Sequence, residues 1–154
     1  MIKGLEFSRA RKSDLAELLE LYKHLICEDP DLDLSRAEAI LDQLNQMEPS
    51  AIYLARIKGR LVASATLVVI PNLTRNGAPY GLVENVVTHN DFRGQGIGRA
   101  LLSHVTSEAW QHGCYKVMLM TGSQKHETLN FYRKCGFEPS KTGFQIRKIP
   151  ARSE

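Results

Sequence analysis

Apolar residues recur along this chain with two spacings, one typical of helices and one typical of strands. Apolar positions three or four residues apart predict amphipathic helices, whereas short runs rich in Val, Ile and aromatic residues predict strands. Helices are predicted over 15–26, 37–47, 101–109 and 127–135. Strands are predicted over 5–8, 52–57, 61–70, 82–88, 115–120 and 144–149. The order β-α-α-β-β-β-α-β-α-β predicts an α/β fold with a mixed, mostly antiparallel sheet flanked by helices.

Polar residues and glycines mark where the predicted elements begin and end. Ser13 and Asp14 are good N-cap residues for the first helix, and Ser35 to Glu38 has the spacing of a capping box for the second. The segment 58–60, Lys-Gly-Arg, separates two strand patterns as a tight hairpin turn does. Because the sequence has no repeat, low-complexity tract or linker, we expect a single domain over 1–154.

Composition narrows the class of protein. With 43% hydrophobic and 24% charged residues, the chain is typical of globular proteins. A net charge of +3 suits a small anionic ligand but is too low for a dedicated nucleic-acid binder. The run 61–70 is too short to span a bilayer, and the first residues do not have the pattern of a secretion signal. Cys27, Cys114 and Cys135 lack metal-site spacing, so we expect reduced core thiols, no metal and a cytoplasmic location.

The stretch from Leu82 to Leu102 carries the strongest chemical signal. Its apolar strand contains one carboxylate, Glu84, and the polar residues 89–91 interrupt the apolar pattern. The segment 93–99, Arg-Gly-Gln-Gly-Ile-Gly-Arg, then opens a predicted helix. Glycines let the backbone approach a ligand closely, and the free N–H groups of a first helical turn attract phosphate oxygens. We therefore expect this loop to bind an anion, with its two arginines adding positive charge.

The spacing of the glycines excludes two common phosphate-binding motifs and matches a third. No Lys-Ser/Thr follows them, as a P-loop requires, and the third position of a dinucleotide fingerprint falls on Arg99 or Leu101. The segment does match Arg-x-x-Gly-x-Gly, with Arg93, Gly96 and Gly98, directly after the strand VENVVTH. This motif resembles the pyrophosphate-binding loop of the GNAT N-acetyltransferases, which holds coenzyme A.

A second motif carries the same resemblance. Asn130 to Phe137, with the sequence NFYRKCGF, is similar to the aromatic-Tyr-x-x-x-Gly-Phe signature of GNAT proteins, and the order of elements extends the likeness over nearly the whole chain. Within the superfamily, VENVVTH, GCYKVML, NFYRKCGF and FQIRK look most like glucosamine-6-phosphate N-acetyltransferases. The stretch 71–80 departs from that pattern, and this departure bears on whether the acceptor is the same sugar. Lys125 and Thr128 also stand where the superfamily usually has Asn and Ala. This second departure bears only on a detail of cofactor binding.

The resemblance implies an acetyl-CoA-dependent N-acetyltransferase that acts on the primary amine of a small molecule, such as an amino sugar or an amino-acid-like amine. The pantetheine arm would pair with the central strand, where a backbone N–H would polarise the thioester carbonyl. The expected acetyl-CoA-binding residues are Val86, Val87, Thr88, Arg93, Gly94, Gln95, Gly96, Ile97, Gly98 and Arg99. The likeness also implies a homodimer, with residues 144–148 and 71–80 near the partner.

Two side chains are candidates for the proton transfers of such a reaction. Glu84 is a candidate general base acting through a water if its apolar surroundings raise its proton affinity; alternatively it binds and orients the amine. Tyr132 is a candidate acid for the leaving thiolate, because a phenol stays protonated at neutral pH; alternatively it is a hydrogen-bonded core tyrosine. Arg75 and Tyr80 could line an acceptor pocket or a dimer contact, and the sequence leaves both open.

Two other functions remain open at this point. One is acetylation of a protein N-terminus or lysine, and the other is a CoA-binding regulatory module without turnover. The presence of both Glu84 and Tyr132 favours the enzyme, because a module that only binds CoA needs neither. We expect no nucleic acid and no membrane among its partners.

Overall fold

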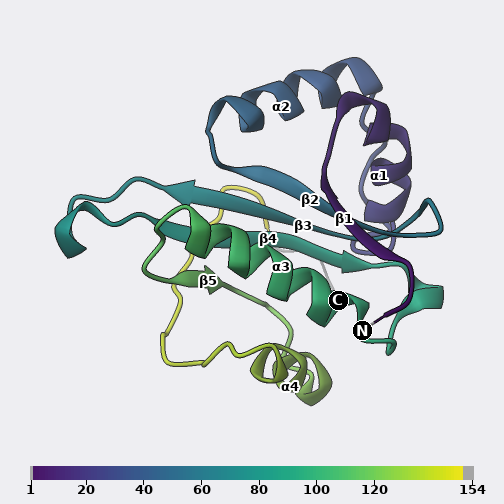
Figure 1. The fold of residues 1–154 in the computed structure, drawn as a ribbon. Helices are drawn as coiled ribbons and strands as arrows, with labels where there is room; N and C mark the ends of the chain where they lie inside the picture. The colour runs from purple at the N-terminus through teal and green to yellow at the C-terminus, as the bar shows by residue number, and fades with distance from the viewer. Residues whose placement is uncertain (1, 151–154) are drawn as a thin grey trace. The chain divides into compact units, whose positions relative to one another are not determined.

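A five-stranded sheet forms the centre of the first of two compact units. The computed structural model describes residues 2–150 and divides the chain after Leu119. The strands lie in the order β1-β2-β3-β4-β5 (Figure 1). They span Leu5–Arg9, Ala51–Ile57, Arg60–Ile70, Tyr80–Thr88 and Val117–Leu119. All pairs are antiparallel except β4 and β5, which are parallel, so the predicted mixed and mostly antiparallel sheet is confirmed.

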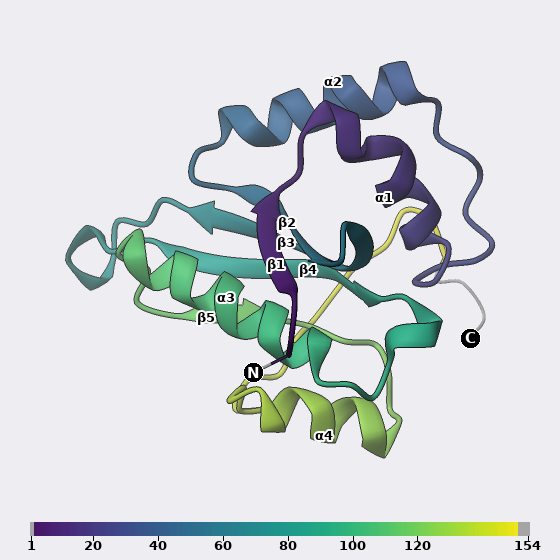
Figure 2. The same ribbon diagram turned by 45° about the vertical axis from the view of Figure 1, so that its right-hand side comes forward.

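Helices cover both faces of this sheet. Helices α1 (Leu15–Tyr22) and α2 (Leu34–Gln46) lie on one face, and α3 (Ile97–Gln111) lies on the other (Figures 1 and 2). Short 3-10 turns, η1 (Lys12–Asp14), η2 (Arg75–Gly77) and η3 (Asn90–Phe92), connect these elements. On the α1–α2 side, leucines of both helices pack in one cluster with apolar residues of β2, β3 and β4. Burial of these apolar faces fixes the sheet between the two helical layers.

The second unit, from Met120 onward, contains the helix α4 (His126–Lys134). Gly136, with φ of 91°, ends it in a left-handed conformation, as the glycine pattern predicts. The strand predicted over 144–149 is wrong, because residues 135–150 form no strand in the structure. Phe144 and Ile146 are instead 93% and 100% exposed. An alternating apolar segment becomes a strand only when a neighbour supplies its ladder hydrogen bonds, and no described part of the chain does so.

Three local predictions need correction. The second helix has Asp33 as its N-cap, with the carboxylate accepting from the Arg36 N–H at 3.1 Å, so the capping box over 35–38 is wrong. The first helix ends at Tyr22; residues 23–25 form a turn and residue 26 has no regular structure. Of the three thiols, only that of Cys114 is buried; Cys27 is exposed and therefore not a core residue.

Candidate active site

A β-bulge interrupts the pairing of β4 at the centre of the candidate site. Ser64 lies opposite Val87 and Thr66 lies opposite Glu84, so the one residue of β3 between them faces two residues of β4. Within the bulge, Asn85 adopts φ of 51°, in the left-handed region. A bulge bends its strand and redirects the backbone groups on either side of it. The backbone from Glu84 to Val87 is therefore oriented differently from the regular strand that precedes it.

The other edge of β4 is open over the same residues. Strand β5 pairs only with Gly81–Val83, and the part of the chain that the structure describes provides no further ladder partner on that side of β4. Unpaired backbone groups on a strand edge can pair with an added extended chain. This open stretch contains the three residues that the family resemblance assigns to the pantetheine arm, Val86, Val87 and Thr88.

Glu84 points from β4 toward the face of the sheet that α1 covers. It is paired across the ladder with Thr66, so both side chains lie on one face. Tyr22 of α1 lies beside Thr66 there; burial raises the pKa of the Tyr22 hydroxyl, and the neighbouring hydroxyls of Ser64 and Thr66 offset part of the rise. Glu84 itself is exposed and makes no hydrogen bond or ion pair to any described residue. Its carboxylate is accessible to a ligand, but the apolar burial expected from the sequence is absent.

The glycine loop ends in a cluster of backbone donors at the start of α3. Gly94 and Gly96 adopt φ of 74° and 80°, and Gly96 is the N-cap of α3. None of the N–H groups from 94 to 99 donates a hydrogen bond to another described residue. Ile97 is buried to 1% exposure and anchors this turn to the core. Consecutive free N–H groups at a helix N-terminus suit phosphate oxygens, so these residues fit a pyrophosphate.

The three polar side chains of the loop have different surroundings. Arg93 donates from Nε to the Thr88 carbonyl at 3.2 Å and from Nη2 to the His24 carbonyl at 2.9 Å, so its guanidinium contacts protein backbone. Gln95 donates to the Asp91 carbonyl at 3.1 Å. Arg99 is exposed, without a hydrogen bond or ion pair to the rest of residues 2–150. In the sequence the two arginines of the loop look alike, and no local pattern identifies His24 as the partner of Arg93.

Tyr132 lies in the second unit, on α4. Its ring contacts Phe131 and Phe137 edge to face, with centroids 5.1 and 6.4 Å apart. The Phe137 N–H donates to the Tyr132 carbonyl at 3.1 Å, which closes the end of the helix. The aromatic motif therefore forms one local cluster around Tyr132.

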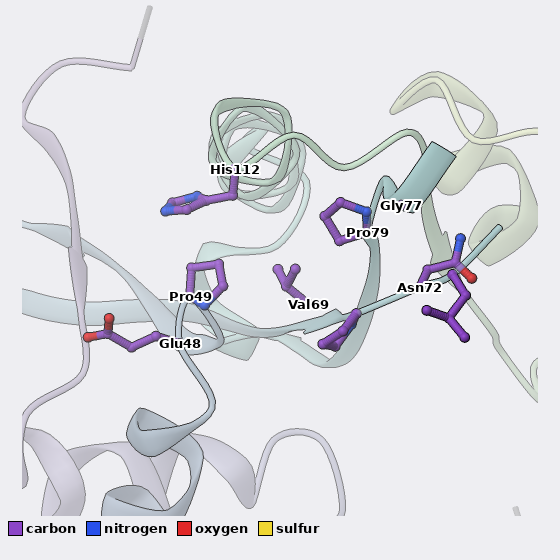
Figure 3. A pocket seen from close by; sticks show the side chains of 9 residues that line it. Glu48, Pro49, Val69, Asn72, Gly77, Pro79 and His112 are labelled. Atoms are coloured by element: carbon purple, nitrogen blue, oxygen red, sulfur yellow. The ribbon is translucent and has the colours of Figure 1, made fainter. Parts of the chain in front are cut away.

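A cavity of about 470 Å³ lies away from the glycine loop. Glu48 and Pro49, between α2 and β2, line it together with Val69 of β3, Pro79 and His112 (Figure 3). His112 is the C-cap of α3, whereas the glycine loop is at the N-terminus of the same helix. This cavity is therefore separate from the candidate site.

The 71–80 loop next to this cavity is held by its own contacts. The Asn72 amide donates to the carbonyls of Thr74 and Ala78 at 3.0 and 3.1 Å. The Arg75 guanidinium lies over the Tyr115 ring at 5.5 Å, and Tyr80 meets Tyr115 with ring centroids 6.4 Å apart. Arg75 and Tyr80 are thus members of one aromatic cluster at the start of β4.

Residues 2–150 contain neither a metal-binding cluster nor a membrane-spanning helix. No three His, Cys, Asp or Glu side chains lie together as a metal ion would require. Among the described helices, none is long and apolar enough to cross a membrane.

Comparisons with known proteins agree on one family. The model of the family described as acetyltransferase (GNAT) matches residues 15–137. A glucosamine 6-phosphate N-acetyltransferase of Trypanosoma brucei brucei is 35% identical over 137 residues, which cover 88% of this chain and 90% of that protein. A solved structure from Agrobacterium tumefaciens str. C58 is named provisionally as an acetyltransferase. It has a TM-score of 0.88 and 43% identity to this chain, and the match covers 93% of this chain and 99% of that chain. A solved acetyltransferase of Trypanosoma brucei has a TM-score of 0.82 and 32% identity, covering 93% and 99%.

The free N–H groups of the glycine loop predict the effect of one substitution. Gly96→Asp places a carboxylate beside them, and two like charges ~4 Å apart repel by ~1–4 kcal/mol in water and near a protein surface. We expect CoA, measured by isothermal titration calorimetry, to bind roughly tenfold more weakly or worse. Gly113→Asp is the matched control, since Gly113 has φ of 78° at the opposite end of α3. Wild-type affinity in the Gly96→Asp variant would exclude this loop as the phosphate site.

Proposed function

Because the chain belongs to the acetyltransferase (GNAT) family, we propose that it transfers the acetyl group of acetyl-CoA to the primary amine of an amino-sugar phosphate. The observation that carries the proposal is the open edge of β4 leading into the free N–H groups of the glycine loop. That arrangement suits a ligand with an extended amide arm and a pyrophosphate. The acceptor class is supported by the Trypanosoma brucei brucei relative, which is named for glucosamine 6-phosphate.

In this proposal the backbone binds and orients acetyl-CoA, which supplies the acetyl group as a thioester. The N–H groups from 94 to 99 bind the pyrophosphate, and Arg99 adds positive charge beside them. The backbone of Val86, Val87 and Thr88 pairs with the pantetheine arm, and one N–H of this stretch polarises the thioester carbonyl. The bulge supports this assignment, because it redirects the backbone there.

Two side chains carry the protons in the proposed reaction. Glu84 accepts the proton of the acceptor ammonium through a water, which frees the amine to attack the carbonyl carbon. As the carbon–sulfur bond breaks, the Tyr132 hydroxyl donates a proton to the leaving thiolate, and the proton that the attacking nitrogen loses on becoming an amide returns to Tyr132 through water. Exposure of the Glu84 carboxylate leaves room for a water between it and the acceptor amine, whereas the role of Tyr132 is supported by its place in the NFYRKCGF motif.

A panel of acceptors tests the proposed activity. Full-length protein with acetyl-CoA is offered glucosamine 6-phosphate, glucosamine, and peptides with a free N-terminus or a lysine, and released thiol is measured. We expect kcat/KM to be highest for the phosphorylated sugar. Preference for a peptide would replace the proposal with protein acetylation, and no thiol release with any acceptor would favour a CoA-binding module.

Replacing Glu84 by Gln tests the general base. The glutamine keeps the size of the side chain but cannot take the amine proton, so turnover should fall most at low pH, where the amine is protonated. Activity should recover as the pH approaches the pKa of the acceptor amine. Glu6→Gln, at an exposed position on β1, is the control. A loss confined to the KM for the amine at every pH would show that Glu84 binds the acceptor instead.

Replacing Tyr132 by Phe tests the general acid. The ring keeps its contacts with Phe131 and Phe137 while the hydroxyl is lost. Loss of a positioned proton donor costs ~10²–10⁴ in rate, so kcat should fall with acetyl-CoA affinity nearly unchanged. Tyr115→Phe is the matched control. An equal fall in affinity would identify Tyr132 as a binding residue.

We also propose that the protein is a homodimer. Phe144 and Ile146 alternate along the chain and are almost fully exposed, which is unfavourable unless another surface covers them. A second copy of the chain is the partner that the family resemblance suggests. Sedimentation equilibrium at tens of micromolar protein should give twice the 17.3 kDa of one chain, and a monomer would contradict the proposal. The cytoplasmic location stays a prediction.

A further inference from the structure

The glycine loop is tied to the end of α1 by a cluster of polar contacts. The guanidinium of Arg93 bridges two backbone carbonyls, one at the end of β4 and one just after α1. The second acceptor, the His24 carbonyl, is among the last of the helical turn and has no intrahelical donor among the described residues. An arginine at a helix C-terminus satisfies such carbonyls and interacts favourably with the helix dipole.

His89, the residue after β4, is the second connection. Its Nδ1 accepts from the Asp91 N–H at 3.2 Å, which caps the short turn η3 leading into the loop. The ring lies against the His24 imidazole, with centroids 4.0 Å apart. The Arg60 guanidinium lies over the Phe92 ring at 4.9 Å. With Nδ1 accepting, His89 Nε2 carries the proton, so its 3.1 Å approach to Arg60 Nη2 is a contact between two N–H groups and not a hydrogen bond. The turn between β4 and the glycine loop is thus held from α1, β3 and β4.

We propose that Arg93 and His89 are positioning residues that hold the glycine loop in its binding conformation before acetyl-CoA arrives. This inference rests on the proposed function, which places the pyrophosphate on the N–H groups from 94 to 99. Arg93 acts through the carbonyls of Thr88 and His24 rather than as a charge on the phosphates. A preformed loop binds more tightly, because the ligand does not have to order it.

The charge state of His89 agrees with this role. A neutral imidazole accepts a hydrogen bond on one ring nitrogen, and an imidazolium accepts none. Burial lowers the pKa of His89, and the neighbouring His24, Arg60 and Arg93 lower it further, against the opposing effect of Asp91. A cavity of about 280 Å³ beside the two imidazoles is also lined by Glu17 and Glu20 of α1, whose carboxylates pair with Arg56 and Lys23. These effects favour the neutral form of His89, which can accept the hydrogen bond.

Substitutions at Arg93 and Arg99 distinguish a residue that positions the loop from one whose charge attracts the phosphates directly. Arg93→Lys keeps the positive charge but loses the planar fork that reaches both carbonyls. Arg99→Gln is the matched control, because it removes a charge of the same loop that makes no hydrogen bond or ion pair to another described residue. Each variant is compared with wild type by hydrogen exchange of residues 89–93, whose N–H groups are hydrogen-bonded in the free protein, and by the Kd of CoA at low and high salt.

For Arg93→Lys we expect faster exchange of residues 89–93 in the free protein and a Kd for CoA raised roughly tenfold at both salt concentrations, as expected for loss of one charge-assisted hydrogen bond. For Arg99→Gln we expect unchanged exchange and a loss of affinity that shrinks at high salt, since screening weakens exposed charges. Unchanged exchange of residues 89–93 in Arg93→Lys would overturn the inference, whether or not CoA bound more weakly.

Substitutions at His89 provide a rescue test. His89→Ala removes the acceptor for the Asp91 N–H, whereas His89→Asn restores an acceptor at an N-cap position where asparagine is favoured. We expect His89→Ala to exchange faster over 89–93 and to bind CoA more weakly, and His89→Asn to recover most of both. Equal behaviour of the two variants would overturn the role of His89 as a cap.

The proposed function and this inference fail in distinguishable ways. If wild-type protein does not bind CoA, the proposed function is wrong and the inference falls with it. If the wild type binds CoA and Gly96→Asp does not, the site stands, and the Arg93 and His89 variants decide the inference alone. Melting temperatures of all variants confirm that each is folded before its affinity is compared.

Discussion

The site depends on incomplete backbone pairing along β4. One edge of this strand pairs with β3 through a bulge at Asn85, and the other loses its partner after Val83. Backbone N–H and C=O groups require hydrogen bonds, so a strand edge and a helix N-terminus left free in one place form a natural ligand-binding surface. The rest of the first unit keeps that surface in position.

Burial on both faces of the sheet provides this support. Val83 and Val87 are 2% and 3% exposed, although the residues between them are exposed or half-buried. On the α3 side, the leucine at 101 and the valine at 105 are fully buried, which fixes the start of the helix relative to β4. A close-packed interior resists deformation, so the open edge and the glycine loop keep a constant separation.

In the proposed reaction, the two faces of β4 have different roles. Glu84 lies on the face covered by α1, and the free N–H groups from 94 to 99 belong to the N-terminus of α3 on the other face. An amine and a thioester could therefore reach β4 from different sides. The hydrogen bond from Arg93 to the His24 carbonyl connects these two sides, because it links the glycine loop to the end of the helix that covers the Glu84 face.

The sequence by itself determined the elements and the chemical motif, because their signals are local. Helices and hairpins follow from apolar spacing and turn residues, as at Lys58 and Gly59, whose φ of 49° and 80° form the predicted turn. Tertiary structure alone decided the bulge, the exposure of Glu84 and the partner of Arg93. Arg93 and His24 are 69 residues apart, and only the packing of α1 against β3 and β4 brings them together. The segment 144–149 fails as a strand for the same reason, since a ladder needs a neighbour that the pattern of one segment cannot specify.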